Sequence, residues 1–355
     1  MLKDRRSRLS PWLGREQLDC LVMEHPPNLR YLSGFSGSCG LLVLTRDQGW
    51  FICDSRYTLQ ARQEVVGLTV VEHGQRYEAL SQLRIEQGWQ RIGFEAAHCL
   101  VSTQQELEKQ LPGATLVGLS ADLDGIRDRK DPCELEAMSD VASLASQALQ
   151  SVLPLIRPGL IEADLALELE IAMRRRGAEG RGFDFIVASG ERGAMPHGRA
   201  SGKQIQSGEL VTIDFGAVLN GYHSDETVTI GVGKLDQRQQ QIYDVVLEAH
   251  DRAVEAVRPG ISCKELDAVA RDYICEQGFG DFFSHGLGHG VGLEIHEKPT
   301  LSPRSESLLY EGMVVTVEPG IYIPGWGGVR IEDTVVVTGT GCRLLTGVSK
   351  KLLVV

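Results

Sequence analysis

Two patterns of apolar and polar positions alternate along the first 120 residues. Short apolar runs predict strands, and stretches with helical spacing lie between them. The predicted strands are Asp19–Met23, Leu41–Thr45, Trp50–Cys53, Leu68–Val71, Arg91–Phe94 and Thr115–Val117. The predicted helices include Arg56–Glu64 and Tyr77–Gln87. Strands that alternate with helices at this spacing indicate a small α/β domain.

A strong helix start marks the beginning of a second domain. Asp131 is placed to cap a helix, Pro132 occupies its first position, and Glu134 completes a capping box. Apolar residues then follow at helical spacing from Leu135 to Ala148. We therefore predict one domain over residues 1–122 and a second over residues 123–355.

The second domain contains a short internal repeat. The segments 156–159 and 257–260 both end in Arg-Pro-Gly, each follows a long helical stretch, and each precedes an amphipathic helix. A pair of apolar strands comes some tens of residues after each segment. The pattern predicts two similar structural units in this domain.

The first strand pair carries two acids. It turns at Asn220-Gly221, a dipeptide favoured in type I′ hairpins. With that turn Asp214 faces Thr227, and Asp225 lies diagonal to Asp214 on the same face of the sheet.

The second strand pair carries two more acids. Glu318 and Glu332 are symmetric about a Gly/Pro-rich turn near Gly325 and are expected to lie opposite each other. Any one acid alone would be expected at the surface. Two pairs aimed at one place would repel each other and be costly to bury unless cations neutralised them. The matching positions in two similar units therefore predict a metal site.

A glycine-rich segment adds histidines to this picture. His285 and His289 have the spacing of a zinc-binding helix, but the glycines among them disfavour a helix. In an extended segment, residues four apart still share a face. The glycines would also let this backbone run close to another segment.

Composition excludes several other classes of function. Net charge is −12 and the longest Lys/Arg block is Arg174-Arg175-Arg176, which argues against nucleic acid as a partner. No apolar run approaches the ~18 residues that cross a bilayer, so no membrane association is expected. Eight scattered cysteines without a C-x-x-C pair predict reduced thiols and a cytoplasmic protein.

Together these motifs resemble the pita-bread metallopeptidase family, which includes methionine aminopeptidase, aminopeptidase P and prolidase, and the chain looks most like bacterial Xaa-Pro peptidases. The residues that carry the resemblance are Asp214 in IDFG, Asp225 in YHSDET, His289 in GHGVGLEIHEKP, Glu318 in VEPG and Glu332 in VRIED. The N-terminal stretch NLRYLSGFSG is similar to the creatinase-type N-terminal domain. The resemblance covers essentially the whole chain. It implies an α/β (α+β) fold in which a creatinase-type domain precedes a pita-bread domain with an internal pseudo-two-fold repeat.

The resemblance also implies the chemistry. The five residues would bind two divalent metal ions, Mn or Co in the first place and Zn or Fe as alternatives. Glu318 would in addition move protons, and His197, His285 and His296 would contact the peptide. The implied reaction is hydrolysis of the N-terminal Xaa-Pro bond of short peptides by a metal-bridging hydroxide, and a homodimer is implied as well.

Other readings of the same fold are a metal-free hydrolase of creatinase type and a catalytically inactive binding module. Both predict lost ligands, and none of the five is missing. One departure is Val228, which stands where many prolyl-specific members have an arginine. Metal binding does not depend on it, although it could tune the ligands.

The resemblance leaves the length of the substrate open between an Xaa-Pro dipeptidase and an aminopeptidase P. A dipeptidase needs a cation for the substrate's C-terminal carboxylate. Some prolidases have an arginine where this chain has Thr300, which favours longer substrates unless Arg199 or Arg304 substitutes. Arg330, two residues before Glu332, is either a partner of the acids or an ordinary strand residue.

Overall fold

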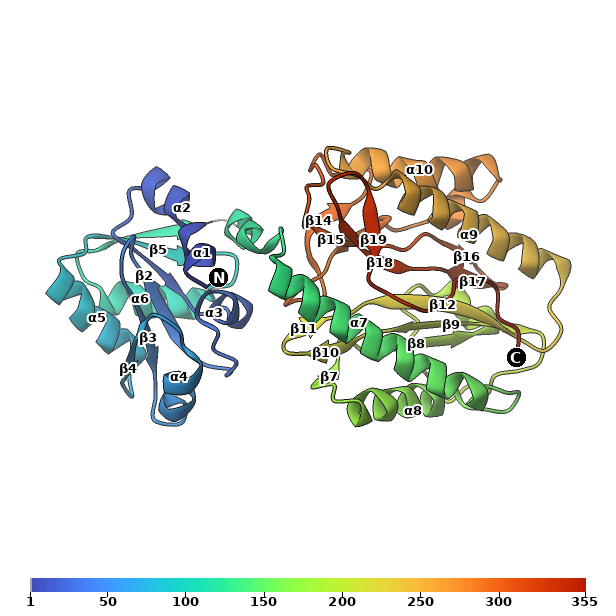
Figure 1. The fold of residues 1–355 in the computed structure, drawn as a ribbon, viewed down its shortest axis with the longest axis horizontal. Coiled ribbons are helices and arrows are strands. Elements are labelled where there is room, and N and C mark those ends of the chain that lie inside the picture. Colours follow the sequence, from blue (N-terminus) through green and yellow to red (C-terminus); the bar gives the residue numbers. More distant parts are fainter. Residues whose placement is uncertain (1, 120) are drawn as a thin grey trace. The chain divides into compact units, whose positions relative to one another are not determined.

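The computed structural model of this chain describes residues 2–119 and 121–355. The chain divides into two compact units: unit 1 ends at Arg127 and unit 2 begins at Asp128. Figure 1 draws unit 1 in blue to teal and unit 2 in green to red. The domain ranges predicted from the sequence, 1–122 and 123–355, stay predictions.

Unit 1 is built on a six-stranded mixed sheet in the order β4-β3-β2-β1-β5-β6. Its strands are β1 (Cys20–Met23), β2 (Leu41–Leu44), β3 (Gly49–Cys53), β4 (Thr69–Glu72), β5 (Arg91–Glu95) and β6 (Thr115–Leu119). Its helices are α1 (Leu2–Ser7), α2 (Ser10–Arg15), α3 (Pro26–Ser33), α4 (Thr58–Glu64), α5 (Arg76–Gln87), α6 (Val101–Gln110) and the 3-10 helix η1 (Ala121–Arg127). All six strands form where the apolar runs predict them, and β1, β2 and β3 are buried along their whole length.

In unit 2, two pairs of long helices lie outside a set of small sheets (Figure 1). Its helices are α7 (Pro132–Val152), α8 (Glu162–Arg175), α9 (Gln237–Ala256), α10 (Cys263–Glu276) and the 3-10 helices η2 (Leu153–Leu155), η3 (Gly190–Ala194) and η4 (Gly280–Phe282). Its strands are β7 (Gly180–Arg181), β8 (Ile186–Ser189), β9 (Glu209–Phe215), β10 (Ala217–Leu219), β11 (Tyr222–His223), β12 (Glu226–Val232), β13 (Gly288–Gly290), β14 (Glu297–Leu301), β15 (Val314–Val317), β16 (Gly320–Ile323), β17 (Gly327–Arg330), β18 (Asp333–Val337) and β19 (Cys342–Leu344).

The long helices begin where their capping residues predict. Asp131 accepts from the backbone of Cys133 and Glu134 at the start of α7, and the Glu134 side chain returns to the backbone of Asp131. Ser262 and Glu265 form the same capping box at the start of α10. Each box satisfies backbone N–H groups that have no partner inside the helix.

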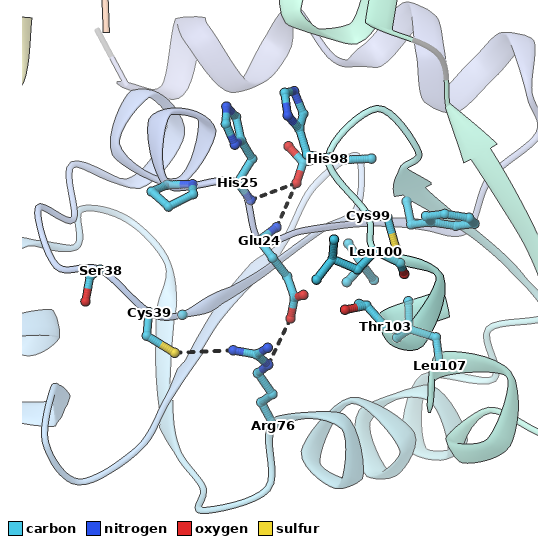
Figure 2. A pocket seen from close by; sticks show the side chains of 15 residues that line it. Glu24, His25, Ser38, Cys39, Arg76, His98, Cys99, Leu100, Thr103 and Leu107 are labelled. Carbon is cyan, nitrogen blue, oxygen red and sulfur yellow. Dashed lines mark hydrogen bonds and ion pairs between the residues drawn. The ribbon is translucent and has the colours of Figure 1, made fainter. Parts of the chain in front are cut away.

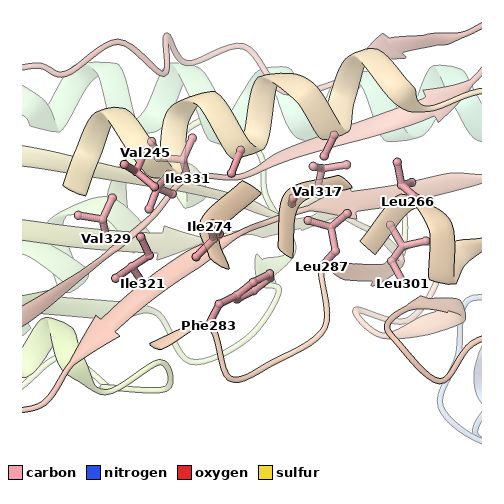
Figure 3. Packing of buried hydrophobic residues seen from close by; sticks show 14 of the residues in the cluster. Val245, Leu266, Ile274, Phe283, Leu287, Leu301, Val317, Ile321, Val329 and Ile331 are labelled. Atoms are coloured by element: carbon pink, nitrogen blue, oxygen red, sulfur yellow. The ribbon is translucent and has the colours of Figure 1, made fainter. Parts of the chain in front are cut away.

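The repeat takes structural form as two halves, each with a helix pair and a strand pair. Helix α7 packs against α8 in the first half, and α9 packs against α10 in the second. Beneath α9 and α10 lies an apolar core that includes Leu266, Ile274, Val317 and Ile331 (Figure 3). This core fixes the strands that flank the acids of the second half, because close-packed interiors tolerate little displacement.

No helix among residues 2–119 and 121–355 combines the length and the apolar character needed to span a bilayer.

Candidate functional site

The first hairpin places two acids on one face. β9 and β12 pair antiparallel with Asp214 opposite Thr227, as the turn predicts, and β10 and β11 continue this register to Asn220-Gly221. Both turn residues have positive φ, 50° and 72°, which a type I′ turn requires. Asp225 directly precedes β12, diagonal to Asp214.

The second hairpin is interrupted in its middle but keeps one register. β15 pairs with β18 and β16 pairs with β17 in a single continuous alignment. Glu318, in the gap between β15 and β16, therefore falls opposite Glu332, in the gap between β17 and β18. A backbone bridge from Thr227 to Glu332 joins the two hairpins, and the Thr227 hydroxyl donates to Glu332 Oε2 at 2.7 Å.

The two hairpins bring the predicted acids together. Carboxylate oxygens of Asp214, Asp225 and Glu332 lie within 4.8 Å of one another. Burial, followed by the charges of the neighbouring acids, raises the pKa of Asp225 and of Glu332 well above the ordinary range. Burial raises the pKa of Glu318 to about 8, and Asp214 adds to the effect. Such a cluster takes up protons or cations, because bare charges at this separation repel.

His289 joins the acids from β13. Its Nε2 lies 3.6 Å from Asp225 Oδ2 and 3.4 Å from Glu318 Oε1. Burial lowers its pKa to about 4, so the ring is neutral near pH 7. Nδ1–H donates to the Gly290 carbonyl at 3.0 Å, which leaves the lone pair of Nε2 directed at the acids. This tautomer is the one that a metal-binding imidazole needs.

Glycines on both sides of His289 permit this close packing. A Cβ at Gly288 would collide with the carbonyl oxygen of Thr316, and one at Gly290 with that of Lys298. The glycine-rich sequence thus serves the close backbone approach that it predicts.

Arg330 is a partner of the acids and is 3% exposed. Its Nη2 donates to Asp214 Oδ2 at 2.6 Å. The other oxygen, Asp214 Oδ1, is buried and has no hydrogen-bond partner among the described residues. One guanidinium cannot balance four carboxylates. An unpartnered buried oxygen, three further acids and one neutral imidazole make a donor set that fits divalent metal ions.

The remaining predicted histidines lie near the acids and Arg330, whose Nη1 donates to the carbonyl oxygen of Pro196, next to His197, at 3.2 Å. The rings of His296 and His289 stand edge to face, with their centroids 4.4 Å apart. Although His296 is exposed by its side-chain surface, the protein around it partly desolvates the ring and lowers its pKa, and His197 lowers it further. His285 is mostly buried, with a pKa of about 4 because of that burial. All eight predicted site residues therefore gather in one region.

Tyr322, which the sequence did not single out, links two residues of this region by hydrogen bonds. His285 Nδ1–H donates to the Gly286 carbonyl at 2.8 Å, so the Tyr322 hydroxyl donates to His285 Nε2, also at 2.8 Å. Arg330 Nη1 in turn donates to the Tyr322 oxygen at 3.0 Å. A signal was available, because the hairpin register puts Tyr322 diagonal to Arg330.

Val228, the departure from the usual arginine, is 4% exposed and pairs with Ile213 in the β9–β12 ladder. Thr300, at the position where some prolidases carry an arginine, pairs with His289 between β13 and β14. The candidate cation Arg199 forms an ion pair with Asp184 at 3.0 Å.

Unit 1 contains a cavity of about 300 Å³, which the sequence did not predict (Figure 2). His25 and His98, distant in sequence, stack beside it with ring centroids 3.6 Å apart. Arg76 pairs with Glu24 at 2.9 Å and approaches Cys39 Sγ at 3.2 Å. Among the described residues, Asp214, Asp225 and Glu332 of unit 2 form a group of three ligand-type side chains close enough to share a metal, and no such group of described residues lies at this cavity.

Comparison with known proteins places this geometry in a family. Residues 136–339 match the model of metallopeptidase family M24, and residues 5–128 match the creatinase/prolidase N-terminal domain. The chain belongs to metallopeptidase family M24. Membership confirms the predicted enzyme class and fold class, and it implies divalent metal ions as cofactors.

Relatives match this member of the family over its full length. An Xaa-Pro dipeptidase of Pyrococcus furiosus is 39% identical over 99% of this chain and 100% of its own. The structure of an Xaa-Pro dipeptidase from Bacillus anthracis superposes with a TM-score of 0.98 at 40% identity and covers 100% of both chains. The structure of an X-Pro aminopeptidase from Thermotoga maritima superposes with a TM-score of 0.93 at 36% identity and covers 98% of this chain and 100% of its own.

Proposed function

We propose that this enzyme hydrolyses the Xaa-Pro bond at the N-terminus of short peptides, with two divalent metal ions as cofactors. The observation that carries the proposal is the convergence of three carboxylates within 4.8 Å beside the free Nε2 of His289. Asp214, Asp225, His289, Glu318 and Glu332 would hold the ions. Mn²⁺ or Co²⁺ suits this oxygen-rich set, with Zn²⁺ or Fe²⁺ as alternatives. Bound there, the ions would supply Lewis acidity that makes water a stronger acid and stabilises negative charge on the peptide oxygen.

Glu318 is the proton carrier in this proposal. It would take a proton from the attacking water and deliver it to the proline nitrogen as the peptide bond breaks. In the metal-free protein burial raises the pKa of Glu318 to about 8, and bound cations would lower it and so favour the carboxylate form that accepts a proton from water. The Thr316 hydroxyl donates to Glu318 Oε1 at 3.2 Å and would orient the carboxylate during these transfers.

The three remaining histidines would bind the peptide. His296 is exposed beside His289 and would donate a hydrogen bond to the scissile carbonyl oxygen. His197 is also exposed and would contact the leaving-group side. His285 is neutral because of its burial and is oriented by the Tyr322 hydroxyl. It would line the subsite for the proline ring.

The preference for proline rests on relatives named Xaa-Pro dipeptidase and X-Pro aminopeptidase. Dipeptides are the first candidate substrate, because dipeptidases match this chain at 39% and 40% identity. Longer Xaa-Pro peptides are the second candidate, since Thr300 provides no positive charge for a substrate carboxylate.

A product assay on three peptides tests the proposal. Purified enzyme is incubated with Ala-Pro, Ala-Pro-Ala and Met-Ala-Ala, with Mn²⁺, Co²⁺ and Zn²⁺ in parallel. Cleavage of Ala-Pro alone identifies a dipeptidase, and cleavage of Ala-Pro-Ala identifies an aminopeptidase P. Cleavage of Met-Ala-Ala alone would overturn the prolyl preference. Full activity of the Asp225→Asn variant would overturn the metal site.

A homodimer and a cytoplasmic location complete the proposal. All eight cysteines of the chain are free, which accords with a reducing compartment. Sedimentation analysis of the purified enzyme tests the dimer.

A further inference from the structure

The two halves of unit 2 share a motif that the metal site only partly uses. Asp225-Glu226-Thr227 in the first half corresponds to Glu332-Asp333-Thr334 in the second: acid, acid, threonine. The first acid of each triplet belongs to the candidate metal site. Successive residues of an extended strand point to opposite faces, so the second acids point away from that site.

Behind the site, one ammonium group joins these second acids. Lys350 Nζ lies 2.6 Å from Glu226 Oε1 and 3.2 Å from Asp333 Oδ1. The side chains of Lys350, Glu226 and Asp333 are 8%, 1% and 4% exposed. Burial alone would lower the pKa of Lys350, but the two carboxylates raise it above its ordinary value. The lysine is therefore charged at neutral pH.

Each second acid is also held by groups from the surrounding elements. The Ser146 hydroxyl, on α7, donates to Glu226 Oε2 at 2.7 Å. His250 Nε2, on α9, lies 3.2 Å from Asp333 Oδ2. Both halves thus have their own anchor, and Lys350 is the group that the two carboxylates have in common.

The threonines of the triplets cross between the halves in a reciprocal way. Thr227 of the first half donates to Glu332 Oε2 of the second at 2.7 Å. Thr334 of the second half donates to the backbone oxygen of Asp225 in the first, also at 2.7 Å. Each triplet therefore donates one hydrogen bond to the first acid of the other triplet.

We propose that Lys350 is a positioning residue for the metal centre, because its bridge between Glu226 and Asp333 sets the separation of the neighbouring acids Asp225 and Glu332. This inference rests on the proposed metal site. A buried ion pair contributes little net stability, since the loss of hydration offsets much of its attraction. What the bridge supplies is geometry, and metal sites depend on ligand positions held to within about 0.5 Å.

Contacts other than this ammonium group also hold the C-terminal segment. The Tyr243 hydroxyl donates to the backbone oxygen of Lys350 at 2.8 Å, and the backbone N–H of Val348 donates to Glu226 Oε1 at 2.9 Å. Val354 forms a further backbone bridge with Gly231. Removal of the charge therefore tests positioning separately from the attachment of the segment.

The test compares Lys350→Met with Lys351→Met, which removes an exposed lysine from the next position. Each full-length, metal-free protein is titrated with Mn²⁺ by calorimetry, and its fold is followed by circular dichroism and thermal melting. We expect Lys350→Met to bind Mn²⁺ about tenfold more weakly with an unchanged spectrum, and Lys351→Met to match the wild type. Loss of affinity of less than fivefold in Lys350→Met, or an equal loss in Lys351→Met, overturns the inference.

A second variant covers the case in which Lys350→Met fails to fold. Glu226→Gln combined with Lys350→Met removes the uncompensated charge while Asp333 keeps His250, and the same fivefold criterion then applies. Wild-type protein that binds no Mn²⁺ would overturn the metal site together with this inference. If the wild type binds Mn²⁺ and the variants that carry Lys350→Met bind it with unchanged affinity, the inference alone is overturned.

Discussion

Arg330 Nη2 donates a hydrogen bond to Asp214 Oδ2 at 2.6 Å, and the two side chains are only 3% and 13% exposed. This contact settles the choice between a partner of the acids and an ordinary strand residue. It also ties one half of unit 2 to the other, because Asp214 lies on β9 and Arg330 on β17. The guanidinium restrains one carboxylate oxygen of Asp214, and the second is buried without a hydrogen-bond partner among the described residues.

Arg330→Met is expected to lower kcat/KM by roughly 10- to 100-fold, because Asp214 would lose the group that orients it. Arg330→Lys should recover only part of the loss, since an ammonium group cannot donate to both Asp214 and Tyr322 in the same geometry. Steady-state kinetics and metal analysis measure both effects. Arg343, exposed on β19, provides the control Arg343→Met. Full activity in Arg330→Met would contradict the assigned role.

Tyr322→Phe removes the hydroxyl that connects Arg330 to His285. The substitution leaves His285 Nε2 without its donor in a buried position, at a cost of about 1–3 kcal/mol. We expect a higher KM for Ala-Pro with the metal content unchanged, because His285 would lose its orientation while the ligands keep theirs. Tyr310→Phe, at a tyrosine 47% exposed, is the matched control. Equal KM values in the two variants would argue against a substrate-binding role for His285.

Glu318→Gln keeps the shape of the side chain but removes the proton carrier. General acid–base catalysis contributes typically 10²- to 10⁴-fold, so kcat should fall by about that factor while KM changes little. Single-turnover measurements at saturating Mn²⁺ separate this effect from weaker metal binding. A variant that regains wild-type kcat in excess Mn²⁺ would show that Glu318 serves only to bind metal.

Metal removal should make the stability of the protein fall as pH rises. In the metal-free protein the pKa values of Asp225 and Glu332 are raised, and that of Glu318 is about 8. Between the ordinary carboxyl pKa of about 4 and about 8, these three acids bind more protons in the native state than in the unfolded chain, so their contribution to the free energy of unfolding decreases with pH. Thermal melts in chelator should give a lower Tm at pH 8.5 than at pH 5.5.

Mn²⁺ should reverse this trend, because the metal binds deprotonated ligands and stabilises the native state. Asp225→Asn offers an internal control, since removal of one repelling acid should raise the metal-free Tm at pH 8.5 while metal binding weakens. A metal-free Tm that increases from pH 5.5 to 8.5 would refute the idea that these acids repel.

Local signals in the sequence predicted much of this molecule. The strands of unit 1 follow from apolar runs, α7 follows from its capping box, and the register of the first hairpin follows from Asn220-Gly221. That register places Asp214 opposite Thr227. Each of these signals depends on residues close together in the chain.

Contacts between distant segments were beyond local patterns. The stacking of His25 on His98 depends on how β1 and β5 align, and nothing near either histidine encodes it. Helix α3 begins with two prolines, which suit the first positions of a helix. Lys350 lies more than a hundred residues from Glu226, and its place behind the site follows only from the folded chain.

The backbone bridge between Thr227 and Glu332 has a consequence for folding on the ribosome. Each hairpin can form from a local stretch of chain, but the proposed ligands of the two halves meet only when the hairpins dock through long-range contacts such as this bridge, and such contacts form late. While synthesis has reached only the first hairpin, the nascent chain has just Asp214 and Asp225 of the five proposed ligands. The proposed ligand set is therefore complete only after the second hairpin has been synthesised and has docked on the first.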